Sequence, residues 1–268
     1  RLWIATDKGL SLFVPEKNNF INYQLKDKSD GRNIGMVELQ TDLNNNLWLT
    51  SQRGLVFFNS LTKSFTLYPA HEKDPHGLTS NNIYNLFIDP SGILWFGSGA
   101  VGLQWINKPY SKFIKYKDNP GQPHHFAAGL VTGFAESNDS SIWLATLRGL
   151  YHWQPRTDSF TFEKFSKTLG KDFYTTVIIA DKLGRIWFGA GDNAIQGKQG
   201  LYCYDPKTGQ TKYFGNDKKD TTSLSGNYIG SLLQDHLGNI WVGTGEGGMC
   251  RYNEKLQNFT RYPFNKNT

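Results

Sequence analysis

A tryptophan that returns six times at nearly equal spacing is the feature that most restricts how this chain can fold. It lies in phrases such as LWIATDKGL, LWLTSQRGL and IWVGTGEGGM. The six positions are Trp3, Trp48, Trp95, Trp143, Trp187 and Trp241. Successive positions differ by 45, 47, 48, 44 and 54 residues. Because repeats of about 40–50 residues with short strands are typical of β-propellers, the spacing favours that architecture.

Each repeat contains the pattern of a four-stranded meander. An apolar stretch such as NIYNLFID (82–89) comes first, and the tryptophan strand follows a tight turn. A Gly-rich turn then leads to a strand that opens on Gly-Leu, and a last short strand such as SFTLYP (64–69) closes the unit. Short strands separated by turn residues at regular intervals predict antiparallel hairpins.

The turn before each tryptophan strand has the form D-x-x-G in most repeats, as in DPSG, DKLG and DHLG. Asp accepts hydrogen bonds from backbone N–H groups two residues on, and Gly tolerates a positive φ, so this pattern closes a short hairpin. Asn45 takes the Gly place in the second repeat, and Asn tolerates the same conformation. The fourth repeat has Ser137 and Ser140 in the Asp and Gly places, so we expect a different turn there.

The fold class is therefore predicted as all-β, a single β-propeller over residues 1–268 built from four-stranded antiparallel blades. Stacking the sheets radially covers faces that one sheet alone would expose. First strands are expected near 34–42, 82–89, 129–136, 173–181 and 227–235, and none precedes Trp3. This pattern predicts five complete blades and three strands of a sixth. The chain is interpreted as a fragment of a seven-bladed ring, with a six-bladed ring that lacks one inner strand as the alternative.

The aromatic and cysteine residues are expected to serve packing. All six repeat tryptophans should pack between blades, and Trp105 and Trp153 should also be packing residues. Cys203 and Cys250 fall on the third strands of neighbouring repeats. Stacked sheets lie about 10 Å apart, which is too far for an easy disulfide, so two buried free thiols are expected.

Composition excludes several classes of function. The net charge of +6 is spread over single Lys and Arg residues, which argues against a nucleic-acid partner. The apolar runs have the length of strands, so no membrane contact is expected within this segment. The phrases GSGAVG and GTGEGG match a dinucleotide-binding pattern, but a Gly-Leu strand follows where a helix would be needed. No cofactor is predicted.

Residues that the repeat does not require indicate a ligand site. In propellers, the turns from second to third strand and the connections between blades share one face. Arginine there can receive an anionic group through forked hydrogen bonds, so we predict a polar pocket, with solvated turn residues as the alternative. The predicted ligand-binding residues are Lys8, Arg53, Arg148, His76, His124, His125 and Asp192, and the same loops carry His71, Asp74 and Lys198.

Neither catalytic residues nor a metal site are predicted. The loop-face carboxylates Asp74, Asp192 and Glu246 show no recurrent pairing of the kind a glycoside hydrolase needs. No pair of histidines has ligand spacing that an acidic residue supports.

The phrases DPSGILWFGSGAVGLQWIN and DHLGNIWVGTGEGGMCRYN, each followed by F-x-x-Y, resemble the two-component regulator propeller repeat. The resemblance covers the whole chain in six copies. It implies the periplasmic sensor region of a bacterial transmembrane signalling protein, either a hybrid histidine kinase or a sensor diguanylate cyclase. The output domain would lie outside this chain, which would itself not be an enzyme.

From this resemblance and the loop residues, we expect a ligand-sensing segment that binds a small molecule or an oligosaccharide. A homodimer of the full protein is also expected. Two alternatives stay open: a propeller polysaccharide lyase or hydrolase, and a protein-interaction scaffold.

Overall fold

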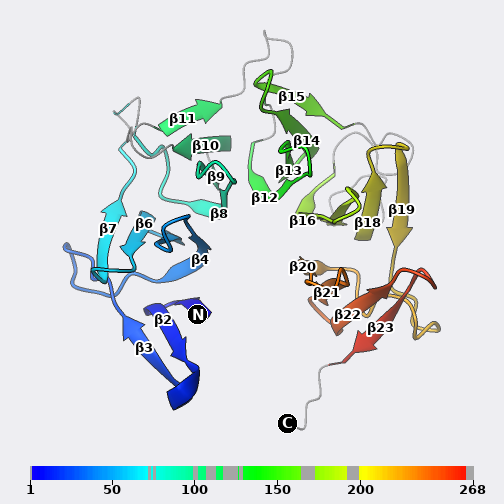
Figure 1. Ribbon diagram of the computed structural model, residues 1–268, viewed down its shortest axis with the longest axis horizontal. Helices are drawn as coiled ribbons and strands as arrows, with labels where there is room; N and C mark the ends of the chain where they lie inside the picture. Colours follow the sequence, from blue (N-terminus) through cyan, green and yellow to red (C-terminus); the bar gives the residue numbers. More distant parts are fainter. Residues whose placement is uncertain are drawn as a thin grey trace. The chain divides into compact units, whose positions relative to one another are not determined.

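The computed structural model describes residues 2–71, 74, 77–98, 102–106, 113–116, 126, 129–163, 173–191 and 199–263. Within these ranges the chain forms 23 β-strands and one short 3-10 helix, η1 (Pro15–Lys17) (Figure 1). The chain divides into two compact units. Unit 1 comprises Arg1–Asp118 and Gly129–Val131, and unit 2 comprises Asn119–Ala128 and Thr132–Thr268.

Unit 1 contains one three-stranded and two four-stranded antiparallel sheets, each ordered as its strands follow in the chain. The sheets are β1 (Leu2–Thr6), β2 (Gly9–Val14) and β3 (Asn19–Tyr23); β4 (Met36–Thr41), β5 (Leu47–Ser51), β6 (Gly54–Asn59) and β7 (Ser64–Tyr68); and β8 (Ile83–Ile88), β9 (Leu94–Ser98), β10 (Gly102–Ile106) and β11 (Phe113–Tyr116).

Unit 2 contains three four-stranded sheets of the same topology, with Val131 at the start of β12 counted in unit 1. The sheets are β12 (Val131–Glu136), β13 (Ile142–Thr146), β14 (Gly149–Gln154) and β15 (Ser159–Phe162); β16 (Thr175–Ala180), β17 (Ile186–Ala190), β18 (Gly200–Asp205) and β19 (Gln210–Phe214); and β20 (Ile229–Gln234), β21 (Ile240–Thr244), β22 (Gly248–Asn253) and β23 (Asn258–Tyr262). The predicted meander is thus confirmed in every repeat, as are the five complete blades and the three-stranded sixth.

The hairpin turns explain the spacing between the Asp and the Trp of each repeat. The Asp89 carboxylate accepts hydrogen bonds from the Ile93 backbone N–H at 3.0 Å and from the Trp95 indole N–H at 2.9 Å. The same indole bond recurs at 2.9 Å in Asp181–Trp187 and in Asp235–Trp241. One carboxylate therefore closes the turn and also fixes the tryptophan of the next strand.

The expectation of a different turn in the fourth repeat is wrong. Ser140 adopts a φ of 64°, and its N–H donates to the Ser137 carbonyl at 3.0 Å, as Gly92 does to Asp89. The Ser137 hydroxyl accepts the Trp143 indole N–H at 3.0 Å. A hydroxyl therefore substitutes for the carboxylate, and the backbone of the turn is unchanged.

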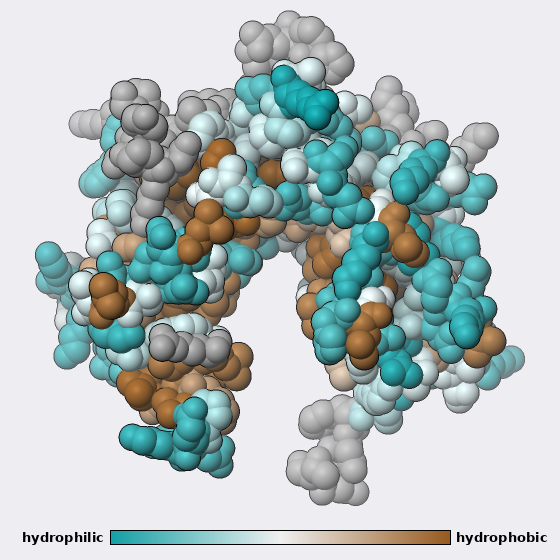
Figure 2. All heavy atoms as spheres, in the orientation of Figure 1, coloured by the Kyte–Doolittle hydropathy of each residue, from teal (hydrophilic) through white to brown (hydrophobic). Residues whose placement is uncertain are grey.

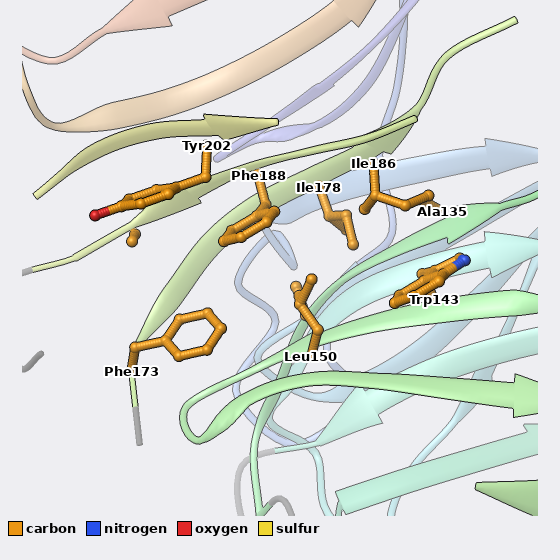
Figure 3. Packing of buried hydrophobic residues seen from close by; sticks show 10 residues of the cluster. Ala135, Trp143, Leu150, Phe173, Ile178, Ile186, Phe188 and Tyr202 are labelled. Atoms are coloured by element: carbon orange, nitrogen blue, oxygen red, sulfur yellow. The ribbon is translucent and has the colours of Figure 1, made fainter. Parts of the chain in front are cut away.

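Trp3, Trp48, Trp143 and Trp187 pack between sheets, as predicted. Trp241 instead contacts Tyr262 of its own sheet and lines a pocket on the β20–β23 sheet. Trp143 lies in a buried cluster that joins the β12–β15 and β16–β19 sheets, where Leu150 and Ile178 pack beside it (Figure 3). Trp187 is fully buried and packs edge-on against Tyr252 of the next sheet, with ring centroids 4.9 Å apart. Cys203 and Cys250 are both buried and free, which confirms the prediction for the two thiols.

The first strands of four sheets carry a recurring bulge, and side chains from β4 and β16 bond the backbone of the next sheet's first strand. The pairing register shifts within β4, β8, β16 and β20. In unit 1, Glu38 Oε2 accepts the Leu86 backbone N–H at 3.2 Å. In unit 2, the Thr176 hydroxyl donates to the Ile229 carbonyl at 2.7 Å. An unpaired strand edge leaves backbone groups unsatisfied, so these side chains contribute to joining each sheet to the next.

Some apolar side chains remain on the surface. Figure 2 shows hydrophobic atoms over the β1–β3 sheet, where Phe20 and Ile21 are exposed, and over the β20–β23 sheet, where Leu233 and Met249 are exposed. In the β16–β19 sheet, Ile179 is equivalent to Leu233 and Leu201 is equivalent to Met249, and both are packed against the β20–β23 sheet.

Candidate functional site

The turns that carry Lys8, Arg53 and Arg148 share one bracing scheme. The Ser51 hydroxyl donates to the Gly54 carbonyl at 2.8 Å and accepts the Arg53 backbone N–H at 3.2 Å. Thr6 braces the Lys8 turn in the same way, and Thr146 braces the Arg148 turn. The three basic residues therefore occupy equivalent positions, as the repeat predicted.

Glycine is required after the basic residue because of the adjoining strand. Gly54 has a φ of 119°, and a Cβ atom there would lie 2.3 Å from the Tyr68 carbonyl oxygen. Such a contact is not tolerated, and the backbone conformation itself disfavours other residues. The Gly-Leu start of the third strand thus fixes the point at which Arg53 leaves the sheet.

The connection between the first and second sheets folds into a small hairpin beside Arg53. Lys26 and Asn33 form an isolated β-bridge, and the Asp27 N–H donates to the Arg32 carbonyl at 2.8 Å. Gly31 closes the turn with a φ of 70° and donates to the Asp27 carbonyl. The hairpin thereby holds Asp27, Asp30 and Arg32 next to the β5–β6 turn.

Asp27 is the anchor that orients Arg53. Its Oδ2 atom pairs with Arg53 Nε at 2.8 Å, and its Oδ1 atom accepts the Ser29 N–H at 2.8 Å and the Ser29 hydroxyl at 2.7 Å. These Ser29 hydrogen bonds, with Arg53 as a smaller contribution, hold the pKa of Asp27 below its ordinary value. The carboxylate therefore stays ionised, and both of its oxygens are occupied.

Asp30 holds Arg53 less tightly. Its Oδ1 atom accepts the Arg32 backbone N–H at 2.9 Å, while its Oδ2 atom lies 3.4 Å from Arg53 Nη2. The Arg53 side chain is 51% exposed and that of Asp30 is 35% exposed. Within the described residues, the Arg32 guanidinium and Arg53 Nη1 make no hydrogen bond or ion pair, so these cationic groups are available to a ligand.

These groups surround a pocket of about 340 Å³, here called the Arg53 pocket. Its lining residues are Asp27, Asp30, Arg32, Asn33, Ile34, Gly35, Gln52 and Arg53. The walls offer charges of both signs and two amide side chains. Such a mixture suits a small polar ligand that can form several hydrogen bonds at once.

Lys8 lines a second pocket of about 340 Å³, formed with residues that include Asp7, Asn22 and Gln24. The connection hairpin lies beside this turn, because a Cβ atom on Gly35 would be 2.9 Å from the Asp7 carbonyl oxygen. Lys8 and Arg53 therefore line separate pockets of unit 1, and Arg148 belongs to unit 2.

The other predicted site residues divide into two groups. Four of them, His76, His124, His125 and Asp192, lie outside the described residues, as does Lys198. His71 and Asp74 form a local turn in which the Asp74 N–H donates to the His71 carbonyl at 3.0 Å. No cluster of three or more His, Cys, Asp or Glu residues suited to a metal ion occurs in the part of the chain that the structure describes.

The sequence pattern missed Asp27, Asp30 and Arg32. They lie in the phrase KDKSDGRN, in the connection between β3 and β4, outside the positions that the repeats share. The density of charge around a Gly was the only available signal.

Among the residues that the structure describes, none forms a helix with the length and apolar character of a membrane span.

Comparison with known proteins bears on the repeat and the fold. A model of the two component regulator propeller family matches residues 77–100 and 223–246. The chain is 25% identical over 309 residues to "Histidine kinase P4" of Formosa agariphila, a match that covers 96% of this chain and 22% of that protein.

Solved structures with the same fold include the extracellular domain of the putative hybrid two component system BT3049 from B. thetaiotaomicron. It superposes with a TM-score of 0.73 at 22% identity, over 98% of this chain and 33% of that one. Virginiamycin B lyase from Staphylococcus aureus superposes with a TM-score of 0.66 at 13% identity, over 98% of this chain and 83% of that one.

The chain spans about a fifth of the curated relative and a third of the extracellular domain that it matches. The family resemblance was based on the tryptophan strands, the D-x-x-G turns and the Gly-Leu starts. The 77–100 and 223–246 matches each include a D-x-x-G turn and a tryptophan strand, and end before the third strand begins. The resemblance to the two-component regulator propeller repeat is confirmed at residues 77–100 and 223–246, and the chain shares its propeller fold with the extracellular domain of the putative hybrid two component system BT3049.

Proposed function

We propose that this chain is the extracytoplasmic, periplasmic ligand-sensing segment of a bacterial two-component sensor, and that its ligand binds in the Arg53 pocket. The observation that carries the proposal is the arrangement of Arg53 itself. Asp27 fixes one edge of its guanidinium, while Nη1 makes no hydrogen bond or ion pair with the described residues. A preoriented and accessible guanidinium is a strong recognition group because little conformational entropy is lost when it binds.

The position of the pocket gives a route for a signal. The connection hairpin joins β3 to β4, and β4 carries the bulge from which Glu38 reaches β8. A ligand that holds the hairpin against Arg53 therefore acts on a segment that continues directly into a joint between sheets. To signal, such a ligand must bind two states of the joint with different affinity.

The test is thermal unfolding of residues 1–268 with panels of sugar oligomers, anionic metabolites and amino acids. We expect at least one class to raise the melting temperature of the wild type and to lose this effect in Arg53→Ala. Arg156→Ala is the matched control, because Arg156 is an exposed arginine in a hairpin turn of unit 2.

A ligand that stabilises wild type and Arg53→Ala equally would place the binding site elsewhere. Failure of every class to shift the melting temperature would contradict the sensing proposal. Light scattering on the same samples reports whether binding changes the oligomeric state, as a sensor that works through a homodimer requires.

A further inference from the structure

The charges around the Arg53 pocket balance. Two acidic residues, Asp27 and Asp30, face two basic residues, Arg32 and Arg53, among its lining residues. Two amide side chains complete the polar wall. A pocket that binds simple anions would carry an excess of positive charge, and this pocket carries none.

The balance is not uniform within the pocket. Asp27 and the Nε edge of Arg53 satisfy each other at 2.8 Å, and the second Asp27 oxygen is filled by Ser29. Asp27 therefore offers a ligand nothing further. The groups that remain are the Nη atoms of Arg53 and the Arg32 guanidinium on the cationic side, and Asp30 Oδ2 on the anionic side.

The contact between Asp30 and Arg53 is loose enough to be exchanged. Their 3.4 Å separation exceeds the roughly 2.7–2.9 Å that is usual for a hydrogen bond between opposite charges. Both side chains are at least one-third exposed, so their mutual attraction is weakened by solvent. A ligand that brings its own carboxylate and its own ammonium can replace this contact with two shorter ones.

Simple ions fit the pocket less well. An anion on Arg32 and Arg53 would lie close to the Asp30 carboxylate, and a cation on Asp30 would lie close to two guanidinium groups. Like charges a few ångströms apart repel by about 1 kcal/mol or more even in a watery environment. A ligand with both charges offsets each repulsion with an attraction, because its ammonium pairs with Asp30 and its carboxylate pairs with the two guanidinium groups.

We infer that the Arg53 pocket binds a zwitterion, specifically the α-carboxylate and α-ammonium of a free amino acid or very short peptide. The carboxylate lies on Arg32 and Arg53, the ammonium lies on Asp30, and Asn33 and Gln52 bond the remaining polar groups. This inference rests on the proposed function, because it assumes that the pocket is a ligand site.

The first test uses pools of the twenty common α-amino acids, read by thermal unfolding of residues 1–268 and followed by calorimetry on the best member. We expect a measurable Kd for that amino acid. Its N-acetyl derivative lacks the ammonium and its amide lacks the carboxylate, so each should bind at least tenfold more weakly.

The second test separates the two ends of the ligand by mutation. Asp30→Asn keeps the volume and the Oδ1 acceptor for the Arg32 N–H, so folding should be preserved while affinity for the amino acid falls at least tenfold. Arg32→Gln should have a similar effect on affinity. Arg156→Gln in unit 2 is the control and should leave the Kd unchanged.

Two results would overturn the inference alone or leave only its ligand class wrong, and a third would also contradict the proposed function. One is that the blocked derivatives bind as well as the free amino acid. The other is that no amino acid pool binds while a sugar oligomer or a simple anion binds in an Arg53-dependent manner. In that second case the proposed sensing function stands and only the ligand class is wrong, whereas silence of every ligand class contradicts both.

Discussion

The joint between β4 and β8 in unit 1 and the joint between β16 and β20 in unit 2 begin from the same strand bulge but use different chemistry. In unit 2, Thr176 spans the joint with a neutral hydroxyl, and a Cβ atom on Gly189 would collide with that hydroxyl. In unit 1, Thr50 stands where Gly189 stands, and its hydroxyl accepts the Glu38 N–H at 3.1 Å. The acidic side chain of Glu38 then spans the joint instead.

A carboxylate spans the β4–β8 joint and a hydroxyl spans the β16–β20 joint, so the first joint is sensitive to pH and the second is not. Burial raises the pKa of Glu38 to about 7, and a single backbone hydrogen bond from Leu86 only partly offsets that effect. A hydroxyl does not titrate in this range. The comparison teaches that one bulge can hold either a fixed or a titrating contact, depending on one neighbouring residue.

The largest expected effect comes from removing the Asp181 carboxylate, which lies in the turn between β16 and β17 of unit 2. Asp181 is buried and accepts the Trp187 indole N–H at 2.9 Å and the Arg185 Nε–H at 2.7 Å. Asp181→Ala leaves these donors unpaired, so we expect the free energy of unfolding to fall by about 3 kcal/mol or more. Denaturant titration measures it. Ser137→Ala, which removes one hydroxyl acceptor, should cost only about 1 kcal/mol; equal losses would contradict this account.

The second prediction concerns the titrating joint. The folded-state pKa of Glu38 lies above the ordinary value of 4.5, so its contribution to stability is complete below pH 4.5 and is lost as the pH rises towards about 7. Glu38→Gln keeps an acceptor for Leu86 and removes the buried charge. We expect it to stabilise the protein by about 1–3 kcal/mol at a pH of about 8.

Unfolding curves between pH 4.5 and 8 measure this difference, since the variant should lose that part of the pH dependence. Thr176→Ser in unit 2 is the control and should retain the wild-type pH profile. A Glu38→Gln variant that is less stable than the wild type at every pH would show that the buried, ionised carboxylate does not reduce the stability of the folded protein.

The third prediction concerns the neutral hydrogen bond that spans the β16–β20 joint in unit 2. Thr176→Val removes the 2.7 Å bond to the Ile229 carbonyl while conserving shape. We expect a loss of about 1 kcal/mol that is the same at every pH between 4.5 and 8. A loss that varied with pH over this range would mean that the unit 2 joint also contains a titrating group.

The smallest effect is expected at an ion pair between two turns of unit 2, the β16–β17 turn and the β22–β23 turn. Arg185 forms a paired contact with the Glu254 carboxylate, with both N···O distances at 2.8 Å, and Glu254 is 56% exposed. Glu254→Gln should reduce stability by about 0.5 kcal/mol, and the difference should shrink in high salt. Melting temperatures at low and high salt measure it; a salt-independent loss would indicate packing rather than charge.

The repeat made most of the fold predictable. The tryptophan spacing, the Gly-Leu starts and the D-x-x-G turns give the strand order, because each reflects a local requirement of the backbone. The Ser137 turn was mispredicted, since the Ser137 hydroxyl replaces a carboxylate as the acceptor for the indole N–H, and the Asp139 carboxylate accepts the Ser141 backbone N–H. The joint chemistry was not predictable, because it depends on which bulged residue crosses to the next sheet.

The candidate site was predictable only in part. Arg53 could be found because the repeat placed it at a turn that the structure braces in three sheets. Asp27 and Asp30 could not, because their connection folds into its own hairpin and no repeat position encodes it. Sequence periodicity describes what the blades share, whereas recognition depends on what each connection has alone.

The brace that holds the turns of Lys8, Arg53 and Arg148 also has a consequence for evolution. Thr6, Ser51 and Thr146 hold their turns through main-chain atoms, whatever side chains lie between the hydroxyl and the glycine. Those intervening pairs are Asp-Lys, Gln-Arg and Leu-Arg. Descendants of such a chain can therefore explore new binding preferences at these positions without first acquiring compensating changes in the framework.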